Sequence, residues 1–92
     1  MDYYLKTNCK LEYVAPKNGT DYKLDELQQM VGGYIQIIQL TPTQIMVINE
    51  EGKLMGLKPN RLATETALLA KAIADNDFIV GDCLVCESKR VK

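Results

Sequence analysis

The sequence predicts an α+β fold: a small, mostly antiparallel meander sheet with two helices, of which the longer packs on one face. Two observations lead to this fold. Runs of β-branched and aromatic residues separated by short turns fill much of residues 34–57, and apolar residues recur at helical spacing on both sides of that region. The chain has 92 residues, so we expect a single domain over residues 1–92 with the order β-α-β-β-β-α-β.

The first predicted element is a strand over residues 10–16. Apolar and charged side chains alternate along most of it, which is typical of a half-buried strand, and Pro16 stops it. Residues 17–21 are turn formers and predict a loop. We treat residues 1–9 as a variable N-terminal segment outside the predicted sheet.

A short helix is predicted over residues 22–31. Leu24, Leu27 and Val31 are spaced as i, i+3 and i+7, which places them on one helical stripe. Thr20 or Asp21 is expected to cap its start, and Gly32 follows as the left-handed residue that ends many helices.

The centre of the chain predicts three consecutive strands. Residues 34–40, 45–48 and 54–57 are apolar runs, and the turn-forming segments 41–43 and 49–53 separate them. Three strands with two short connections form an antiparallel meander.

The last third predicts the longer helix and the last strand. Helical spacing of apolar residues and a high alanine content predict a helix over residues 61–74, with either Asn60 or Thr64 as its cap. Residues 78–80 are expected to be extended, residues 83–87 to form the last strand, and residues 88–92 to be a polar, frayed tail.

The strands carry many apolar residues, and the longer helix covers only one face of the predicted sheet. The other face must then be solvated or covered by a partner. We therefore expect the protein to pair with itself as a homo-oligomer.

The composition argues against several classes of protein. The net charge is −1, so nothing indicates the basic surface of a nucleic-acid-binding protein. No segment has the roughly 20 apolar residues of a membrane helix, and the N-terminus does not resemble a signal peptide. The three cysteines do not suggest a disulfide framework. We expect a cytoplasmic protein with no membrane contact.

The chain offers little for catalysis or metal binding. Cys83 and Cys86 have C-x-x-C spacing, but on a strand residues three apart face opposite sides, so we expect ordinary buried cysteines. The chain has no histidine, which removes the commonest general base. Glu50, Glu51 and the Asp75/Asp77 pair lie in predicted turns and are expected to be solvated. We therefore predict no enzyme activity, no metal and no cofactor.

The candidate ligand-binding residues are Lys58, Asn60, Arg61 and Tyr34. The first three precede or begin the longer predicted helix, where free N–H groups attract anions and an arginine fork can bind a phosphate. Tyr34, or alternatively Tyr13, could stack on a base. The competing interpretation is that Asn60 only caps the helix and Arg61 pairs with Glu65.

Three phrases in order resemble a known family: residues 27–35, residues 49–64, and Ile79-Val80-Gly81-Asp82. Together they resemble the family catalogued as domain of unknown function 3846, over roughly residues 10–87. Its members are small proteins or modules common in bacteriophages, plasmids and the bacteria that carry them. The resemblance implies a phage or mobile-element origin and a role inside the host bacterial cell, where such proteins often counter host defences.

These observations lead to one main hypothesis and two alternatives. The main hypothesis is a non-catalytic binding protein that sequesters an anionic, nucleotide-type ligand in counter-defence. The first alternative is a protein-interaction module that binds or inhibits a host protein through a sheet face or an edge strand. The second is a weak enzyme acting on a phosphorylated substrate.

Overall fold

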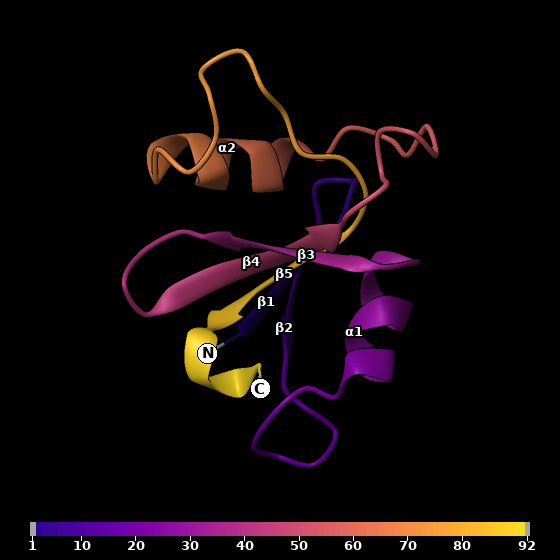
Figure 1. Cartoon of the computed structure of the whole chain (residues 1–92), viewed down its shortest axis with the longest axis vertical. Helices are drawn as coiled ribbons and strands as arrows, with labels where there is room; N and C mark the ends of the chain where they lie inside the picture. The colour runs from indigo at the N-terminus through magenta and orange to yellow at the C-terminus, as the bar shows by residue number, and fades with distance from the viewer. Residues whose placement is uncertain (1, 92) are drawn as a thin grey trace.

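The computed structural model describes residues 2–91 and contains one five-stranded antiparallel sheet, in the order β2-β1-β5-β4-β3 (Figure 1). Two helices and a short 3₁₀ turn complete the described chain. The predicted α+β class with a small antiparallel sheet and two helices is therefore confirmed. The strands are β1 Asp2–Leu5, β2 Leu11–Val14, β3 Ile35–Gln39, β4 Gln44–Asn49 and β5 Cys83–Glu87, and the helices are α1 Leu24–Val31 and α2 Arg61–Leu69.

The two helices lie on opposite faces of the sheet, as Figure 1 shows with the sheet seen nearly edge-on. Met46, Cys83 and Val85 pack on the side of α2, and Val47, Leu84 and Cys86 pack on the side of α1. We call these two sides the α2 face and the α1 face. The central strands β4 and β5 are thus buried on both sides, which explains why they are apolar at almost every position.

The sheet face that was expected to be free for a partner is covered. Helix α1 buries Leu27 and Val31 against it, together with Tyr22 from the preceding loop and Val91 from the C-terminal end. The argument for a homo-oligomer from an uncovered face is therefore wrong. No helix among residues 2–91 is long and apolar enough to cross a membrane.

The N-terminal segment is part of the sheet. Residues 2–5 form β1, which pairs with β2 on one side and β5 on the other, so the first strand lies inside the sheet. This strand was not predicted, and Met1 lies outside the described residues. The predicted strand over residues 10–16 is shorter and spans Leu11–Val14.

The predicted strand over residues 54–57 is a series of turns. Met55 N donates to Glu51 O and Leu57 N donates to Gly52 O, and Gly56 has a φ of +69°. The place beside β4 that this strand was expected to take belongs to β5. Leu54 is consequently 87% exposed.

Helix α2 ends at Leu69 and does not reach residue 74. Lys71 adopts a left-handed conformation with a φ of +56°, and Ala72 N donates back to Ala67 O. This is the hydrogen-bond pattern that ends many helices, here formed with lysine in the place usually taken by glycine. The chain then runs back across the α2 face through residues 72–80.

Helix α1 begins two residues later than predicted. Its N-cap is Lys23, whose backbone N–H donates to the Glu26 carboxylate, so neither Thr20 nor Asp21 caps it. Gly32, with a φ of +82°, ends the helix as predicted. The Gly32-Gly33 pair therefore ends a helix and leads into β3.

The C-terminal end is anchored, in contrast to the predicted frayed tail. Ser88–Arg90 forms a 3₁₀ turn. Arg90 Nε lies 3.4 Å from Asp2 Oδ1, and Tyr22 Oη donates to Asp2 Oδ2 at 2.7 Å. Asp2 is 2% exposed, and these two partners compensate for the removal of its carboxylate from water. Lys92 lies outside the described residues.

Candidate functional site

Asn60 is a buried structural residue. Its side chain is completely inaccessible to solvent, and its Oδ1 accepts a hydrogen bond from Ala63 N at the start of α2. Its Nδ2 donates to Leu5 O at 2.9 Å and to Gly81 O at 2.8 Å. The amide thus joins the end of β1, the chain before β5 and the start of α2. No polar atom of Asn60 is left to meet a ligand.

Arg61 and Lys58 are exposed, but they do not share one binding site. Arg61 Nε pairs with Glu65 Oε1 at 3.1 Å, in the i, i+4 arrangement of the competing interpretation. That hydrogen bond raises the pKa of the guanidinium. Lys58 borders a different hollow, of about 330 Å³, together with Gly81 and Asp82.

Tyr34 lies apart from these residues, at the start of β3. Its ring is 65% exposed, and its carbonyl accepts from Glu50 N. The structure therefore does not bring Tyr34, Asn60 and Arg61 together around one ligand. Tyr13, the alternative aromatic residue, is 68% exposed on β2, at the opposite edge of the sheet.

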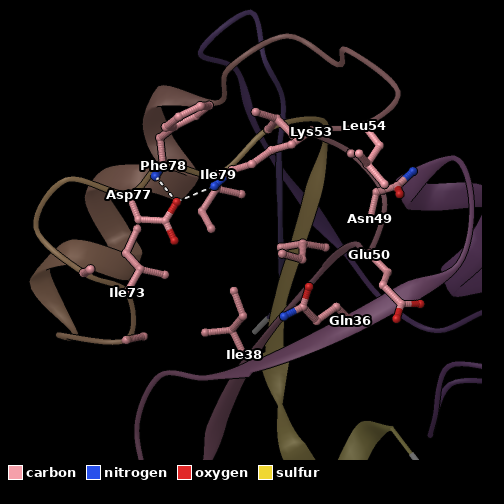
Figure 2. A pocket seen from close by; sticks show the side chains of 15 residues that line it. Gln36, Ile38, Asn49, Glu50, Lys53, Leu54, Ile73, Asp77, Phe78 and Ile79 are labelled. Atoms are coloured by element: carbon pink, nitrogen blue, oxygen red, sulfur yellow. Dashed lines mark hydrogen bonds and ion pairs between the residues drawn. The ribbon is translucent and has the colours of Figure 1, made fainter.

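A different hollow has the size of a ligand site. It lies on the α2 face between β3, β4, the turn after β4 and residues 72–80, and it measures about 510 Å³ (Figure 2). We call it the main pocket. Ligand pockets commonly measure about 300–1,000 Å³. Its apolar walls are formed by Ile38, Ile48, Leu54, Ala72, Ile73, Ala74, Phe78, Ile79 and Val80.

One side of the main pocket is held by an ion pair. Figure 2 shows Asp77 between Lys53 and the backbone of Phe78. Lys53 Nζ donates to the Asp77 carboxylate and also lies 4.5 Å from the centre of the Phe78 ring. Phe78 N donates to the same carboxylate at 2.7 Å. The hydrogen bond from Lys53, followed by that from Phe78 N, lowers the pKa of Asp77 below its usual value.

The opposite side carries two polar side chains that are free to meet a ligand. Gln36 comes from β3 and Glu50 from the turn that follows β4, and both are exposed at the pocket. Within residues 2–91 neither side chain makes a hydrogen bond or ion pair. Glu50 was expected to be merely solvated, and the structure gives it a place beside the pocket.

Asn49 fixes the turn that closes the main pocket. It is 4% exposed, its Nδ2 donates to Val31 O at 3.1 Å, and its Oδ1 accepts from Glu51 N at 2.8 Å. It therefore ties the turn after β4 to the end of α1. In the sequence it appeared to be an ordinary turn residue, and nothing pointed to its partner eighteen positions away.

Cys83 and Cys86 do not face each other. Cys83 packs on the α2 face and Cys86 on the α1 face, as expected for residues three apart on a strand. Burial raises the pKa of each of the two thiols to about 12. They therefore stay protonated near neutral pH. Among the described residues, no group of three or more His, Cys, Asp or Glu side chains could hold a metal ion.

A comparison with protein-family models identifies the family of the chain. The model of the family described as "Domain of unknown function (DUF3846)" matches residues 6–91. This agrees with the resemblance found in the sequence. No curated protein and no solved structure matches the chain.

Proposed function

The chain belongs to the family of the domain of unknown function DUF3846, and we propose that it is a non-catalytic binding protein that holds a nucleobase-type ligand in the main pocket. The observation that supports this proposal is the pocket itself. It combines apolar walls with two unpaired polar side chains, Gln36 and Glu50. Binding sites commonly combine apolar walls with a few polar groups that fix the ligand's orientation.

The charges around the pocket favour the neutral part of such a ligand over its phosphate. The lining contains two carboxylates, Glu50 and Asp77, and one ammonium group, Lys53. Lys53 is already paired with Asp77. A phosphate inside the pocket would therefore face the unpaired charge of Glu50 without a free cation to offset it. The phosphate of a nucleotide would remain outside.

The side chains also suit a flat heterocycle with polar edges. Phe78 is 45% exposed at the pocket and offers an aromatic ring. Aromatic stacking contributes about 1–3 kcal/mol per base in single-stranded nucleic-acid sites. Gln36 can both donate and accept hydrogen bonds, and Glu50 can accept from an amino group.

Thermal denaturation with the four ribonucleosides and their 5′-monophosphates tests the proposal. A ligand at 100 times its Kd stabilises the native protein by about 2.7 kcal/mol, so at least one nucleoside should raise the Tm. The matching monophosphate should add nothing to the effect. Glu50→Gln should change this response, and Glu51→Gln should not, because Glu51 is exposed and adjacent but does not line the pocket. No Tm shift with any of the eight compounds would refute the proposal.

The same experiment tests the anion site at the start of α2. If monophosphates bind and nucleosides do not, and if Arg61→Ala abolishes binding, then the site is Lys58 and Arg61 and not the main pocket. Sequestration of a nucleotide signal in counter-defence, by a phage or mobile element in a bacterial cell, remains a proposal that rests on the family resemblance alone. The alternative of a weak enzyme gains nothing from the thiols of Cys83 and Cys86, because their raised pKa values keep them protonated.

A second candidate, a protein-interaction module, is favoured by the exposed edge of β2. Leu11 and Tyr13 are 46% and 68% exposed there, beside a largely apolar hollow of about 280 Å³. An extended segment of another protein could pair with this edge and place a side chain in the hollow. In hydrogen exchange, a bound partner should protect the amides of β2. Binding that survives Tyr13→Lys would exclude this edge.

A further inference from the structure

The other edge of the sheet, β3, is unprotected. Natural edge strands are usually guarded by charged residues, proline, bulges or a short length. The five residues of β3 are Ile-Gln-Ile-Ile-Gln, without a charge or a proline. By contrast, β2 is partly guarded although Leu11 and Tyr13 are exposed: it has four residues, carries Glu12 and is flanked by Lys10 and Pro16.

The hydrogen-bonding pattern shows which main-chain groups β3 leaves open. Glu50 N donates to Tyr34 O, and Leu40 N donates to Gln44 O. In an antiparallel ladder, hydrogen-bonded and non-hydrogen-bonded pairs alternate, so the even-numbered residues of β3 bond to β4. The N–H and C=O groups of Ile35, Ile37 and Gln39 therefore point outwards from the sheet.

The side chains alternate in the same way. Ile38 packs on the α2 face and Ile35 on the α1 face. The even-numbered residues Tyr34, Gln36 and Ile38 therefore lie on the α2 face beside the main pocket. The exposed Ile37, at 47%, lies on the α1 face.

We propose that β3 pairs antiparallel with β3 of a second copy of this chain, about a two-fold axis at Gln36, and that this pairing completes the main pocket. In this register Ile35 of each copy lies opposite Ile37 of the other. These are the outward-pointing pairs, and each exchanges two main-chain hydrogen bonds. The two Gln36 residues face each other, and each Tyr34 lies opposite Ile38 of the partner subunit.

The pair chemistry favours this register over its neighbour. With the axis at Gln36, isoleucine meets isoleucine on the α1 face, and the two amides meet on the α2 face. With the axis at Ile37, Gln36 would lie opposite Ile38, and Ile35 opposite Gln39, so that polar and apolar side chains would be mixed on both faces. The face chemistry of β3 therefore fits a second copy of itself.

The pairing gives Tyr34 a place in the site. Ile38 lines the main pocket, so Tyr34 of the partner subunit, opposite Ile38, would close the pocket on the side of β3. The pairing itself does not depend on the ligand, but this role of Tyr34 rests on the proposed function. The pairing would also bring Tyr34 of one subunit to the ligand in the main pocket of the other, although Tyr34 does not line the pocket of its own subunit.

Register-specific cross-linking tests the pairing. In the unpaired position at the axis, the two Cα atoms at residue 36 would lie about 4.5 Å apart, which suits a disulfide. In a Cys9→Ser background, which removes the exposed native thiol, Gln36→Cys should form a disulfide dimer under mild oxidation. Gln39→Cys, on the same strand but far from its symmetry mate, should not. If an Ile37→Cys variant in the same background formed the disulfide dimer and Gln36→Cys did not, the proposed register would be overturned.

Sedimentation at micromolar concentration tests the assembly without any substitution. The wild type should sediment as a dimer and Ile37→Lys as a monomer, while Tyr13→Lys, a matched charge at the other edge, should leave the dimer intact. A monomeric wild type, together with equal cross-linking of Gln36→Cys and Gln39→Cys, would overturn the pairing.

Ligand binding separates the two proposals. The Tm shift with the four ribonucleosides should indicate about two- to tenfold weaker binding in Tyr34→Ala and in Ile37→Lys, as expected for the loss of one aromatic contact. A dimer that binds no nucleoside would refute the proposed function and leave the pairing standing. Equal binding by the wild type and by a monomeric Ile37→Lys would show that the partner subunit contributes nothing to the pocket.

Discussion

Replacing Asn60 with alanine should destabilise the protein strongly, because this buried side chain donates hydrogen bonds to Leu5 O and Gly81 O and accepts one from Ala63 N, in three separate parts of the chain. Loss of an N-cap costs about 1 kcal/mol. Each buried hydrogen bond to a main-chain carbonyl contributes about 0.5–1.5 kcal/mol. Gly81 O also accepts from the Cys83 thiol at 3.2 Å, so it keeps one donor. The expected loss is therefore about 3 kcal/mol.

The measurement is urea denaturation monitored by circular dichroism. A domain of this size has a free energy of unfolding of about 5–15 kcal/mol, so the loss is a large part of it. The Tm should fall by roughly 12–24 °C. Two further variants sharpen the result. Asn60→Asp keeps the acceptor for Ala63 N but has no donor for the two carbonyls, so it should be at least as unstable as alanine.

Asn76→Ala serves as the matched control. Asn76 is exposed, and such surface substitutions usually change stability by less than about 0.5 kcal/mol. A loss below about 1 kcal/mol in Asn60→Ala would refute the reasoning and would return Asn60 to the list of residues available to a ligand. Full stability in Asn60→Asp would show that capping, and not the contacts to Leu5 and Gly81, is what matters.

Three other outcomes follow from burial and backbone conformation. In the native protein only Cys9 should react quickly with a thiol reagent, because burial raises the pKa values of Cys83 and Cys86 from 9.0 to about 12; three fast thiols would contradict this. For the same reason the free energy of unfolding should be constant up to about pH 9 and should fall toward pH 12, because the thiols ionise at a lower pH in the unfolded chain than in the native protein. A urea midpoint that stays constant from about pH 8 to pH 11 would contradict this expectation. Gly81→Ala should lower the Tm more than Gly19→Ala. The φ angles are alike, +78° and +81°, but only at Gly81 would the new Cβ lie 2.9 Å from a leucine methyl carbon; equal Tm shifts would show that this contact relaxes.

The parts of the fold that the sequence predicts well are those with local signals. The last strand has the predicted bounds, residues 83–87, because an apolar run lies between a glycine turn and a polar end. The β3–β4 hairpin is likewise placed to within a residue or two, since its two strands and turn are adjacent in the chain. Such signals need no knowledge of distant residues.

The errors come from long-range partners. β1 is short and begins with the charged Asp2, and a charged residue is normally expected at the surface. Asp2 can be buried only because Tyr22 and Arg90, which are distant in the sequence, pair with its carboxylate. Residues 54–57 are apolar enough for a strand, but β5 already occupies the place beside β4. Strand neighbours so distant in sequence leave no local pattern.

The same distinction applies to the site. Asn60 was correctly placed at the start of a helix, and the alternative pairing of Arg61 with Glu65 is the one observed, because both depend on spacing within one helix. The main pocket could not be found in this way. Its walls come from β3, the turn after β4 and residues 72–80, which meet only in the folded chain.

The walls of the main pocket are joined to one another before any ligand arrives. The turn after β4 and the 72–80 segment are in close contact at Gly52. A Cβ atom at this position would lie only 2.7 Å from Val80 Cγ2, so any residue other than glycine would force one of the two segments to move. The Lys53–Asp77 pair joins the same two segments, and Asn49 anchors the turn to α1. A ligand therefore does not have to order these loops, which removes a large part of the entropic cost of binding. Gln36 and Ile38 of the edge strand β3 line the pocket, and β3 also leaves main-chain groups unpaired, so in the proposed pairing completing the pocket and completing the sheet are one event.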